Sequence, residues 1–226
     1  MGSFAAAHVF RWGLKILQMI LLIQSLFQRI VWLVTFAGTR VFSSFKIIGQ
    51  DNIRNLPRSL LIIANHRSFW DPLVIGTVFP ISSRYLPLGF MVADEYYKWL
   101  WPFFWLTRTF PAKKGQGMDV SLRAPRRVLK TGGAFLIFPT GYRHYLGRPP
   151  RPRRGAAVLA LEMPSLTILP VYLKTISGWK IRDFLLRRRN IRVVIGKPFN
   201  LKEITSSQNV DEISQVLADK IYELNH

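Results

Sequence analysis

The segment NHRSFWD, residues 65–71, holds the residues of this sequence whose types and spacing best suit chemistry. Its histidine and aspartate, His66 and Asp71, are separated by four residues. An imidazole titrates near neutral pH and can remove a proton from an attacking hydroxyl. A carboxylate on the other ring nitrogen would fix the tautomer and stabilise the imidazolium that forms. Since the chain has no cysteine and no serine in a nucleophile elbow, we expect direct attack by a hydroxyl of the substrate.

Both residues also have structural explanations. Asp71 precedes Pro72, so it suits the N-cap of a helix with proline at its first position. His66 suits a loop histidine that is hydrogen-bonded to backbone. The seven residues alone do not separate these roles from catalysis.

The neighbouring sequence predicts where the motif lies. The apolar run LLIIA, residues 60–64, predicts a buried strand, and Asp71-Pro72 predicts the start of a helix. In open α/β sheets, ligands bind beyond the carboxyl ends of the strands. We therefore expect His66 and Asp71 at such an end, where chemistry is usually done.

Composition narrows the possible partners. The 226 residues carry a net charge of +20 together with 49% hydrophobic residues, which excludes a disordered basic tail. Basic and apolar character together indicate contact with anionic lipid or with anionic substrates. We expect no nucleic-acid partner, because the sequence has no zinc-ligand cysteine pattern, RNA-binding aromatic motif or clear helix-turn-helix. We also expect no metal site.

Residues 9–37 are strongly apolar and predict a membrane-associating helical segment. A stripe of polar residues at helical spacing favours a helix in the membrane interface, or two helices that re-enter one leaflet. A single span or an uncleaved signal anchor is the alternative, in which Arg29 would cost about 2.5–3.5 kcal/mol near the bilayer centre. The length and the internal charges argue against a cleaved signal peptide. The stripe consists of Arg11, Lys15, Gln18, Ser25 and Arg29.

The remaining pattern alternates strands with helices. It predicts an α/β fold with a mixed, largely parallel sheet flanked by helices. We expect a helical segment over residues 1–45 and one domain over 46–226. The expected strands are 45–48, 60–64, 85–93, 134–138, 167–173 and 191–195, and the expected helices are 72–78, 120–130, 155–162 and 210–224.

Three further segments have two explanations each. The aromatic stretch 96–110 suits either the lipid interface or the core. The lysine-glycine loop 110–117 suits either a phosphate or solvent. The arginine-rich stretch 143–154 suits either anionic headgroups or solvent. Residues 187–189 form a second cationic cluster.

Four sequence blocks together resemble the glycerolipid acyltransferase family, of the lysophosphatidic acid acyltransferase (PlsC-like) type. The resemblance covers about residues 50–224, and the blocks occur in the family's order. NHRSFWD matches the family's Asn-His and Asp spacing and is the strongest of them. The other blocks are TFPAKK (109–114), FPTGYRH (138–144) and ILPVYL (168–173).

The resemblance implies transfer of an acyl chain to the hydroxyl of a lysophospholipid, most simply 1-acylglycerol-3-phosphate. His66 would be the general base and Asp71 its orienting partner. Lys113 and Arg143 would bind the acceptor phosphate, and Gly141 would let backbone approach the substrate. The other positions implied in substrate binding are Asn65, Phe138, Pro139, Thr140 and Pro170.

The same resemblance implies the partners. Acyl-CoA or acyl carrier protein would be a co-substrate, and no cofactor would be bound. The enzyme would lie on a membrane with anionic headgroups, as a monotopic or single-span protein with its active site on the cytoplasmic side.

Three positions depart from the family pattern. Thr140 stands where the family has glutamate, so a carboxylate is lost. Lys113 stands for arginine and keeps the charge without the bidentate fork. Tyr142 replaces a threonine. An acyltransferase with a different acceptor, amine-bearing or glycosylated, and a catalytically silent lipid-binding relative therefore stay open.

Overall fold

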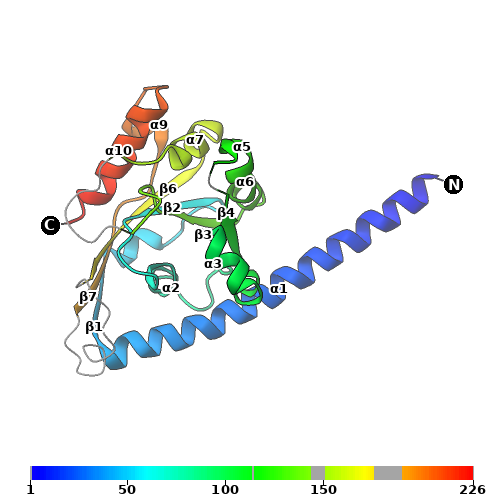
Figure 1. Cartoon of the computed structure of the whole chain (residues 1–226), viewed down its shortest axis with the longest axis horizontal. Helices are drawn as coiled ribbons and strands as arrows, with labels where there is room; N and C mark the ends of the chain where they lie inside the picture. The colour runs from blue at the N-terminus through cyan, green and yellow to red at the C-terminus, as the bar shows by residue number, and fades with distance from the viewer. Residues whose placement is uncertain (1, 114, 144–150, 176–189, 226) are drawn as a thin grey trace.

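The computed structural model describes residues 2–113, 115–143, 151–175 and 190–225, without the side chains of residues 2–10 and 175. It confirms the predicted α/β fold, in which helices cover a mixed sheet (Figure 1). The strands are β1 (Ser44–Ile48), β2 (Leu60–Ala64), β3 (Gly89–Ala93), β4 (Thr109–Ala112), β5 (Ala134–Ile137), β6 (Thr167–Thr175), β7 (Asn190–Ile195) and β8 (Phe199–Asn200). The helices are α1 (Gly2–Phe42), η1 (Gln50–Ile53), α2 (Asp71–Gly76), α3 (Asp94–Trp99), α4 (Trp101–Leu106), α5 (Gly117–Ser121), α6 (Arg123–Lys130), α7 (Gly155–Glu162), α9 (Leu201–Ile204) and α10 (Val210–Tyr222).

The strand order is β1-β7-β6-β2-β5-β3-β4, and β8 pairs with β6. All neighbours are parallel except β6 with β7 and β6 with β8. The expected strand 85–93 begins only at Gly89, and the expected helix 120–130 is divided between α5 and α6. The sheet is thus mixed and largely parallel, as the alternating pattern predicts.

β2 lies in the middle of the sheet and is buried on both faces, as its uninterrupted apolar run requires. Leu60, Ile62 and Ala64 pack in one core with residues of α1 and α2. Leu61 and Ile63 pack in the other core with residues of α6, α7 and α10. α1 and α10 therefore lie on opposite faces of the sheet.

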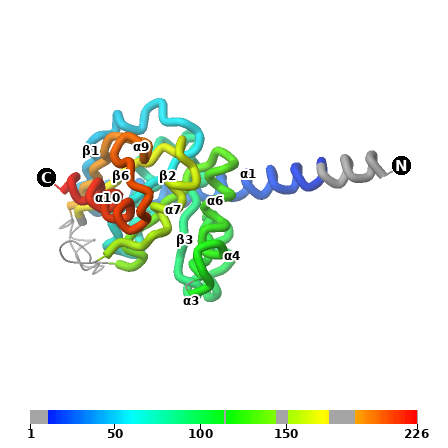
Figure 2. The backbone as a smooth tube through the Cα atoms, turned by 90° about the horizontal axis from the view of Figure 1, so that it is seen from above, coloured from blue at the N-terminus to red at the C-terminus, as the bar shows by residue number. Residues whose placement is uncertain are grey.

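α1 is one continuous helix, so the alternative of two re-entrant helices is wrong. Its N-terminal part projects beyond the domain (Figure 2). Residues 11–42 are long and apolar enough to cross a membrane. Large apolar side chains are exposed along this length: Leu14, Ile16, Leu17, Met19, Leu22, Ile23, Leu26, Ile30, Leu33, Val34 and Val41.

The second half of α1 is docked on the domain by polar side chains. The Gln28 amide donates to the carbonyls of Leu88 and Thr107, both at 2.7 Å, and accepts from the Leu88 N–H at 2.8 Å. Gln24 donates to the Trp105 carbonyl at 2.8 Å. Arg29, a member of the polar stripe, donates from its guanidinium to the Ser83 carbonyl at 3.3 Å. The polar stripe is therefore only partly free for lipid, because loop carbonyls of the domain take up its second half.

We expect Gln28→Leu to lower the free energy of unfolding by at least about 2 kcal/mol. The change leaves a buried N–H and two carbonyls without their partner, and each such group costs about 1–3 kcal/mol. Chemical denaturation in detergent measures the effect. Gln18→Leu is the matched control, because Gln18 is exposed on the same helix. Equal stability of the two variants would show that the Gln28 hydrogen bonds do not contribute to the free energy of unfolding.

Candidate active site

His66 and Asp71 form a hydrogen-bonded pair at the carboxyl end of β2. His66 Nδ1 lies 2.9 Å from Asp71 Oδ2. The side chain of Asp71 is 1% exposed and that of His66 is 18% exposed. A carboxylate only accepts hydrogen bonds, so in the neutral imidazole this contact assigns the proton to Nδ1 and leaves Nε2 with a lone pair. The pair thus has the geometry of a general base with its orienting group.

Asp71 also organises the loop that carries His66. Its Oδ2 accepts from the backbone N–H of Arg67 at 2.5 Å and from that of Ser68 at 2.7 Å. Its Oδ1 accepts from the Ser68 hydroxyl at 2.5 Å. The N-cap of α2 is Trp70, so the explanation of Asp71 as a simple helix cap is wrong. Its carboxylate points back into the loop instead.

Two neighbours fix the position of the histidine. The Asn65 side chain donates to the Leu173 carbonyl at 2.9 Å and accepts from the Leu173 N–H at 2.6 Å, which ties the motif to β6. The Phe138 ring stacks on the His66 ring with centroids 4.1 Å apart. Asn65 therefore has a positioning role, whereas Phe138 forms part of the site surface.

The segment after β5 turns sharply beside this pair. Gly141 has a φ of 67°, and a Cβ there would lie 2.4 Å from side-chain atoms of Arg153. The left-handed backbone conformation favours glycine, whereas the close contact is with the flexible Arg153 side chain, which can move aside. Thr140 is buried, and its hydroxyl donates to the Tyr142 carbonyl at 2.8 Å. Thr140, in the position of the family glutamate, serves the turn itself.

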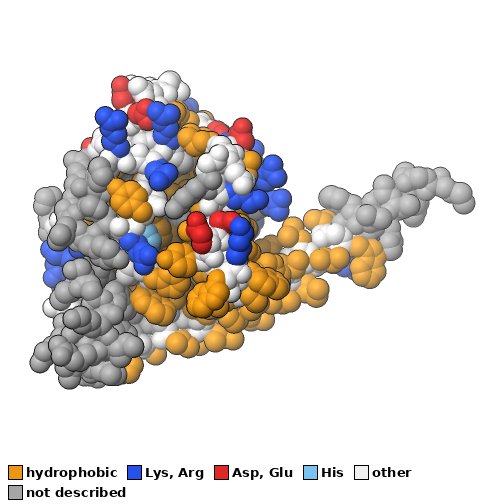
Figure 3. Space-filling view, in the orientation of Figure 1, with side chains coloured by type: hydrophobic (Ala, Val, Ile, Leu, Met, Phe, Trp, Pro, Cys, Tyr) orange, Lys and Arg blue, Asp and Glu red, His pale blue; other side chains and the backbone are white. Residues whose placement is uncertain are grey.

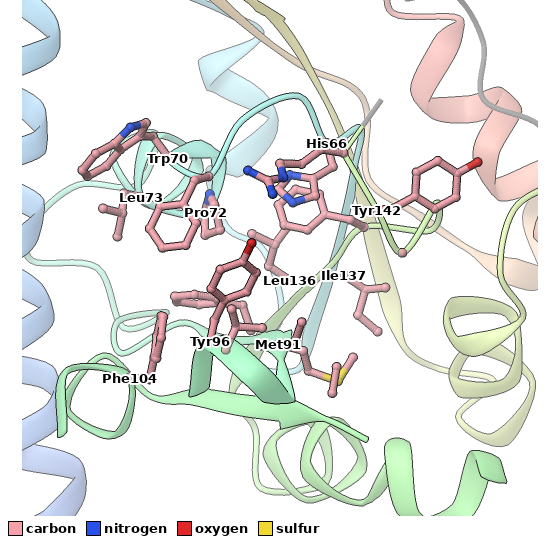
Figure 4. A pocket seen from close by; sticks show the side chains of 18 of the residues that line it. His66, Trp70, Pro72, Leu73, Met91, Tyr96, Phe104, Leu136, Ile137 and Tyr142 are labelled. Atoms are coloured by element: carbon pink, nitrogen blue, oxygen red, sulfur yellow. The ribbon is translucent and has the colours of Figure 1, made fainter. Parts of the chain in front are cut away.

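A cavity of about 570 Å³ opens at His66, a size typical of small-molecule sites, which range over about 300–1,000 Å³ (Figure 4). Most of its lining is apolar, and the polar or charged side chains in it are His66, Tyr96, Tyr142 and Arg143. The apolar lining includes Phe69, Trp70, Pro72, Leu73, Phe90, Met91, Val92, Phe103, Phe104, Leu136, Ile137 and Phe138. The cavity suits a long apolar chain whose reactive end lies at the histidine.

The expected substrate-binding residues do not all line this cavity. Gly141 and Arg143 line it together with His66 and Phe138. Lys113 is exposed and directly follows Ala112, which also lines it. Pro139 and Thr140 are buried in the turn. Pro170 is buried within β6, opposite Ile63 of β2. The structure therefore places Arg143 in the same cavity lining as His66 and places Pro170 inside the sheet.

Sequence reasoning missed several lining residues. Phe90 and Met91 come from β3, and Tyr96 comes from α3. Their signal was present only as apolar and aromatic character, which core residues share. Only the pairing of β3 with β5 places them beside His66.

The aromatic stretch 96–110 divides between core and surface. Phe104 is buried and lines the cavity, whereas Trp99, Trp101 and Trp105 are exposed. Figure 3 shows hydrophobic side chains continuing from the lower part of the domain along α1. The core explanation is confirmed for Phe104, and the lipid-interface explanation stays a prediction for the exposed tryptophans.

The four sequence blocks lie within one recognised domain. The model of the family described as Acyltransferase matches residues 44–174, which is more than half of the chain. The chain belongs to the acyltransferase family. The matched residues include NHRSFWD, TFPAKK, FPTGYRH and ILPVYL.

Relatives of this acyltransferase confirm the resemblance to the lysophosphatidic acid type. A 1-acyl-sn-glycerol-3-phosphate acyltransferase of Streptococcus pneumoniae is 25% identical over 175 residues, covering 76% of this chain and 61% of the relative. One of Saccharomyces cerevisiae is 25% identical over 187 residues, covering 78% and 58%. One of Bacillus subtilis is 24% identical over 181 residues, covering 77% and 86%. This chain thus spans less than two thirds of the first two relatives.

A solved structure shows the same fold. The crystal structure of the 1-acyl-sn-glycerophosphate (LPA) acyltransferase PlsC from Thermotoga maritima aligns with a TM-score of 0.58 at 20% identity. The alignment covers 98% of this chain and 89% of that chain.

Proposed function

We propose that this acyltransferase moves a fatty acyl chain from an acyl thioester to the hydroxyl of 1-acylglycerol-3-phosphate. The observation that carries the proposal is the His66–Asp71 pair at an apolar cavity whose lining also includes Arg143. The names of the three relatives support the acceptor. The pair supplies the base, the cavity suits the acyl chain, and Arg143 supplies a cation for the acceptor phosphate.

In the proposed reaction, Nε2 of His66 removes the proton from the acceptor hydroxyl as its oxygen attacks the thioester carbonyl. An ester bond to carbon forms and the carbon–sulfur bond breaks. The imidazolium then returns its proton to the leaving thiolate, so the histidine ends the cycle neutral. Asp71 holds the ring and stabilises the imidazolium while it exists.

Arg143 and Lys113 are the proposed phosphate ligands of the acceptor. Arg143 is exposed and lines the cavity with His66, and its guanidinium can bind a phosphate through two parallel hydrogen bonds. Lys113 adds a point charge just beyond β4. Thr140 is bonded within its turn, so this grip uses cations without the carboxylate of the family pattern.

The cavity is proposed to hold the acyl chain of the donor, and Met91→Trp tests this. The larger side chain would displace two or three methylenes, worth about 0.8 kcal/mol each. We expect kcat/KM for long-chain thioesters to fall by about tenfold or more, with short chains spared. Rates measured across donor chain lengths show the change. Met118→Trp is the control, since Met118 is exposed and lies outside the cavity lining. If the dependence of the rate on acyl-chain length is unchanged, the donor's acyl chain does not bind in this cavity.

Membrane association through α1 is also proposed. Its exposed apolar side chains and the exposed Trp99, Trp101 and Trp105 suit the interface between headgroups and acyl chains. This placement would supply the acceptor lipid directly to the domain.

Release of free thiol from acyl thioesters tests the proposed function. We expect the purified chain in vesicles to release thiol only when 1-acylglycerol-3-phosphate is added, and less with lysolipids that carry other headgroups. Preference for an amine-bearing or glycosylated acceptor would replace the proposed acceptor. Lipid binding without thiol release, for any acceptor and both donor types, would identify a catalytically silent relative.

A further inference from the structure

Three cations stand side by side on three neighbouring strands. Lys46 of β1 pairs with Arg192 of β7, and Arg192 pairs with Lys174 of β6. Residues that pair directly point to the same face of a sheet. Adjacent strands are about 4.8 Å apart, so the three side chains span about 10 Å. We call Lys46, Lys174 and Arg192 the cationic row.

The cationic row lies on the face of the sheet opposite to α1. Its strand neighbours Ile47, Leu173 and Val193 point the other way and pack against the core that contains Trp32 of α1. All three cations of the row are exposed. β1 and β7 lie together at one side of the sheet, on the left in Figure 1. The row is thus open to solvent on the side away from the apolar helix.

Among the described residues, no ion pair includes a member of the row. Like charges directly opposite one another on neighbouring strands destabilise a sheet. One exposed lysine needs no explanation, but three cations in register form an arrangement that an anion would relieve.

The row leads toward the catalytic pair. The strand next to β6 is β2, and His66 and Arg67 lie in the loop that follows β2. The Arg67 guanidinium donates to the Tyr172 hydroxyl at 3.1 Å and lies over the Tyr172 ring. Tyr172 precedes Lys174 by two residues on β6, on the same face as the row. Positive charge therefore extends from three adjacent strands to Arg67, the residue next to the proposed base.

We propose that the cationic row binds the phosphate groups of coenzyme A when acyl-CoA is the donor. This inference rests on the proposed function and adds the location of a donor site to it. Acyl-CoA carries a diphosphate and a 3′-phosphate at one end and its thioester at the other. Lysine and arginine are the usual partners of such phosphates. The row holds the nucleotide end, while the thioester reaches His66 past Arg67.

The sheet face distinguishes this ligand from a bilayer. α1 carries the long exposed apolar surface, and the row lies on the other side of the sheet. With α1 in the membrane interface, the row faces water, where a soluble donor approaches. An acidic carrier protein is the competing partner, and the experiment separates it by the donor used.

The first test is calorimetric titration of the full-length chain in detergent with adenosine 3′,5′-bisphosphate and with coenzyme A. The nucleotide lacks thioester and acyl chain, so it reports phosphate contacts without turnover. We expect Lys46→Gln, Lys174→Gln and Arg192→Gln combined to weaken both ligands by at least about tenfold. The matched control removes the same charge elsewhere, with Lys130→Gln, Lys197→Gln and Lys202→Gln, all at exposed positions. Equal binding by the two triple variants overturns the proposal.

Turnover and vesicle binding give the remaining outcomes. We expect the row variant to raise KM for acyl-CoA, with kcat, KM for acyl carrier protein and binding to anionic vesicles unchanged. If KM rises only for acyl carrier protein, the proposal is overturned in favour of the carrier protein. If only vesicle binding is lost, it is overturned in favour of an anionic membrane surface. Row-dependent nucleotide binding without any acyl transfer would contradict the proposed function while the row site stands. Acyl transfer by the wild-type chain, together with nucleotide binding that the row variant leaves unaltered, would overturn the row site and leave the proposed function standing.

Discussion

His66→Ala is expected to lower kcat for acyl transfer by about 10²–10⁴-fold, the usual contribution of a general base. The expectation rests on the ring lying in the cavity mouth with Nδ1 held 2.9 Å from Asp71 and Nε2 left to accept a proton. Steady-state rates of thiol release measure the effect. KM for the donor should change little, because the cavity walls that hold the acyl chain are untouched.

The same substitution removes the ring that stacks on Phe138, so folding must be measured beside activity. His66→Gln keeps more of the side-chain volume and should lose activity to a similar degree. Both variants should keep the unfolding transition of the wild-type chain within a few degrees. A folded His66→Ala protein with undiminished turnover would remove His66 from the mechanism.

Asp71→Asn is expected to lower kcat by a similar factor, about 10²–10⁴-fold. The amide keeps the shape of the carboxylate but carries no charge to stabilise the imidazolium. It also presents an N–H₂ group where the site offers only donors at Oδ2, namely His66 and the N–H groups of Arg67 and Ser68. Rates and unfolding are measured together, because the loop also depends on this carboxylate.

Ser68→Ala is the matched control for Asp71→Asn. It removes the hydroxyl that donates to Asp71 Oδ1 and leaves the contact with His66 in place. We expect a modest loss of stability and a kcat within a few-fold of wild type. If Asp71→Asn behaves like Ser68→Ala, the carboxylate acts only on the loop.

Local sequence predicted the elements whose pattern is strong. The apolar runs at residues 60–64 and 134–138 were predicted as strands, and the structure has strands there. A strand buried on both faces needs no alternation of polar and apolar residues. The reversed direction of β7 relative to β6 had no local signal, since strand pairing depends on contacts far apart in sequence. The docking of α1 was hidden for a related reason. Gln28 looks like a polar interruption of an apolar helix until Leu88 and Thr107 are placed beside it.

The candidate site divides in the same way. His66 and Asp71 were found from residue type and spacing, and the structure brings them together. The cavity walls were not found, because Met91 and Tyr96 reach the site only through the pairing of β3 with β5. The direction of the Thr140 side chain was also beyond the sequence, since it depends on the turn that Gly141 allows.

Acyl transfer to the lysolipid hydroxyl at His66 is tested by identifying the lipid formed from a labelled acyl thioester and 1-acylglycerol-3-phosphate. Wild-type chain and His66→Ala are incubated with both substrates in vesicles, and the products are identified by mass. We expect labelled 1,2-diacylglycerol-3-phosphate from the wild-type chain and almost none from the variant. Label that stays in the thioester, or appears only as free fatty acid, would contradict transfer to the lysolipid hydroxyl at His66.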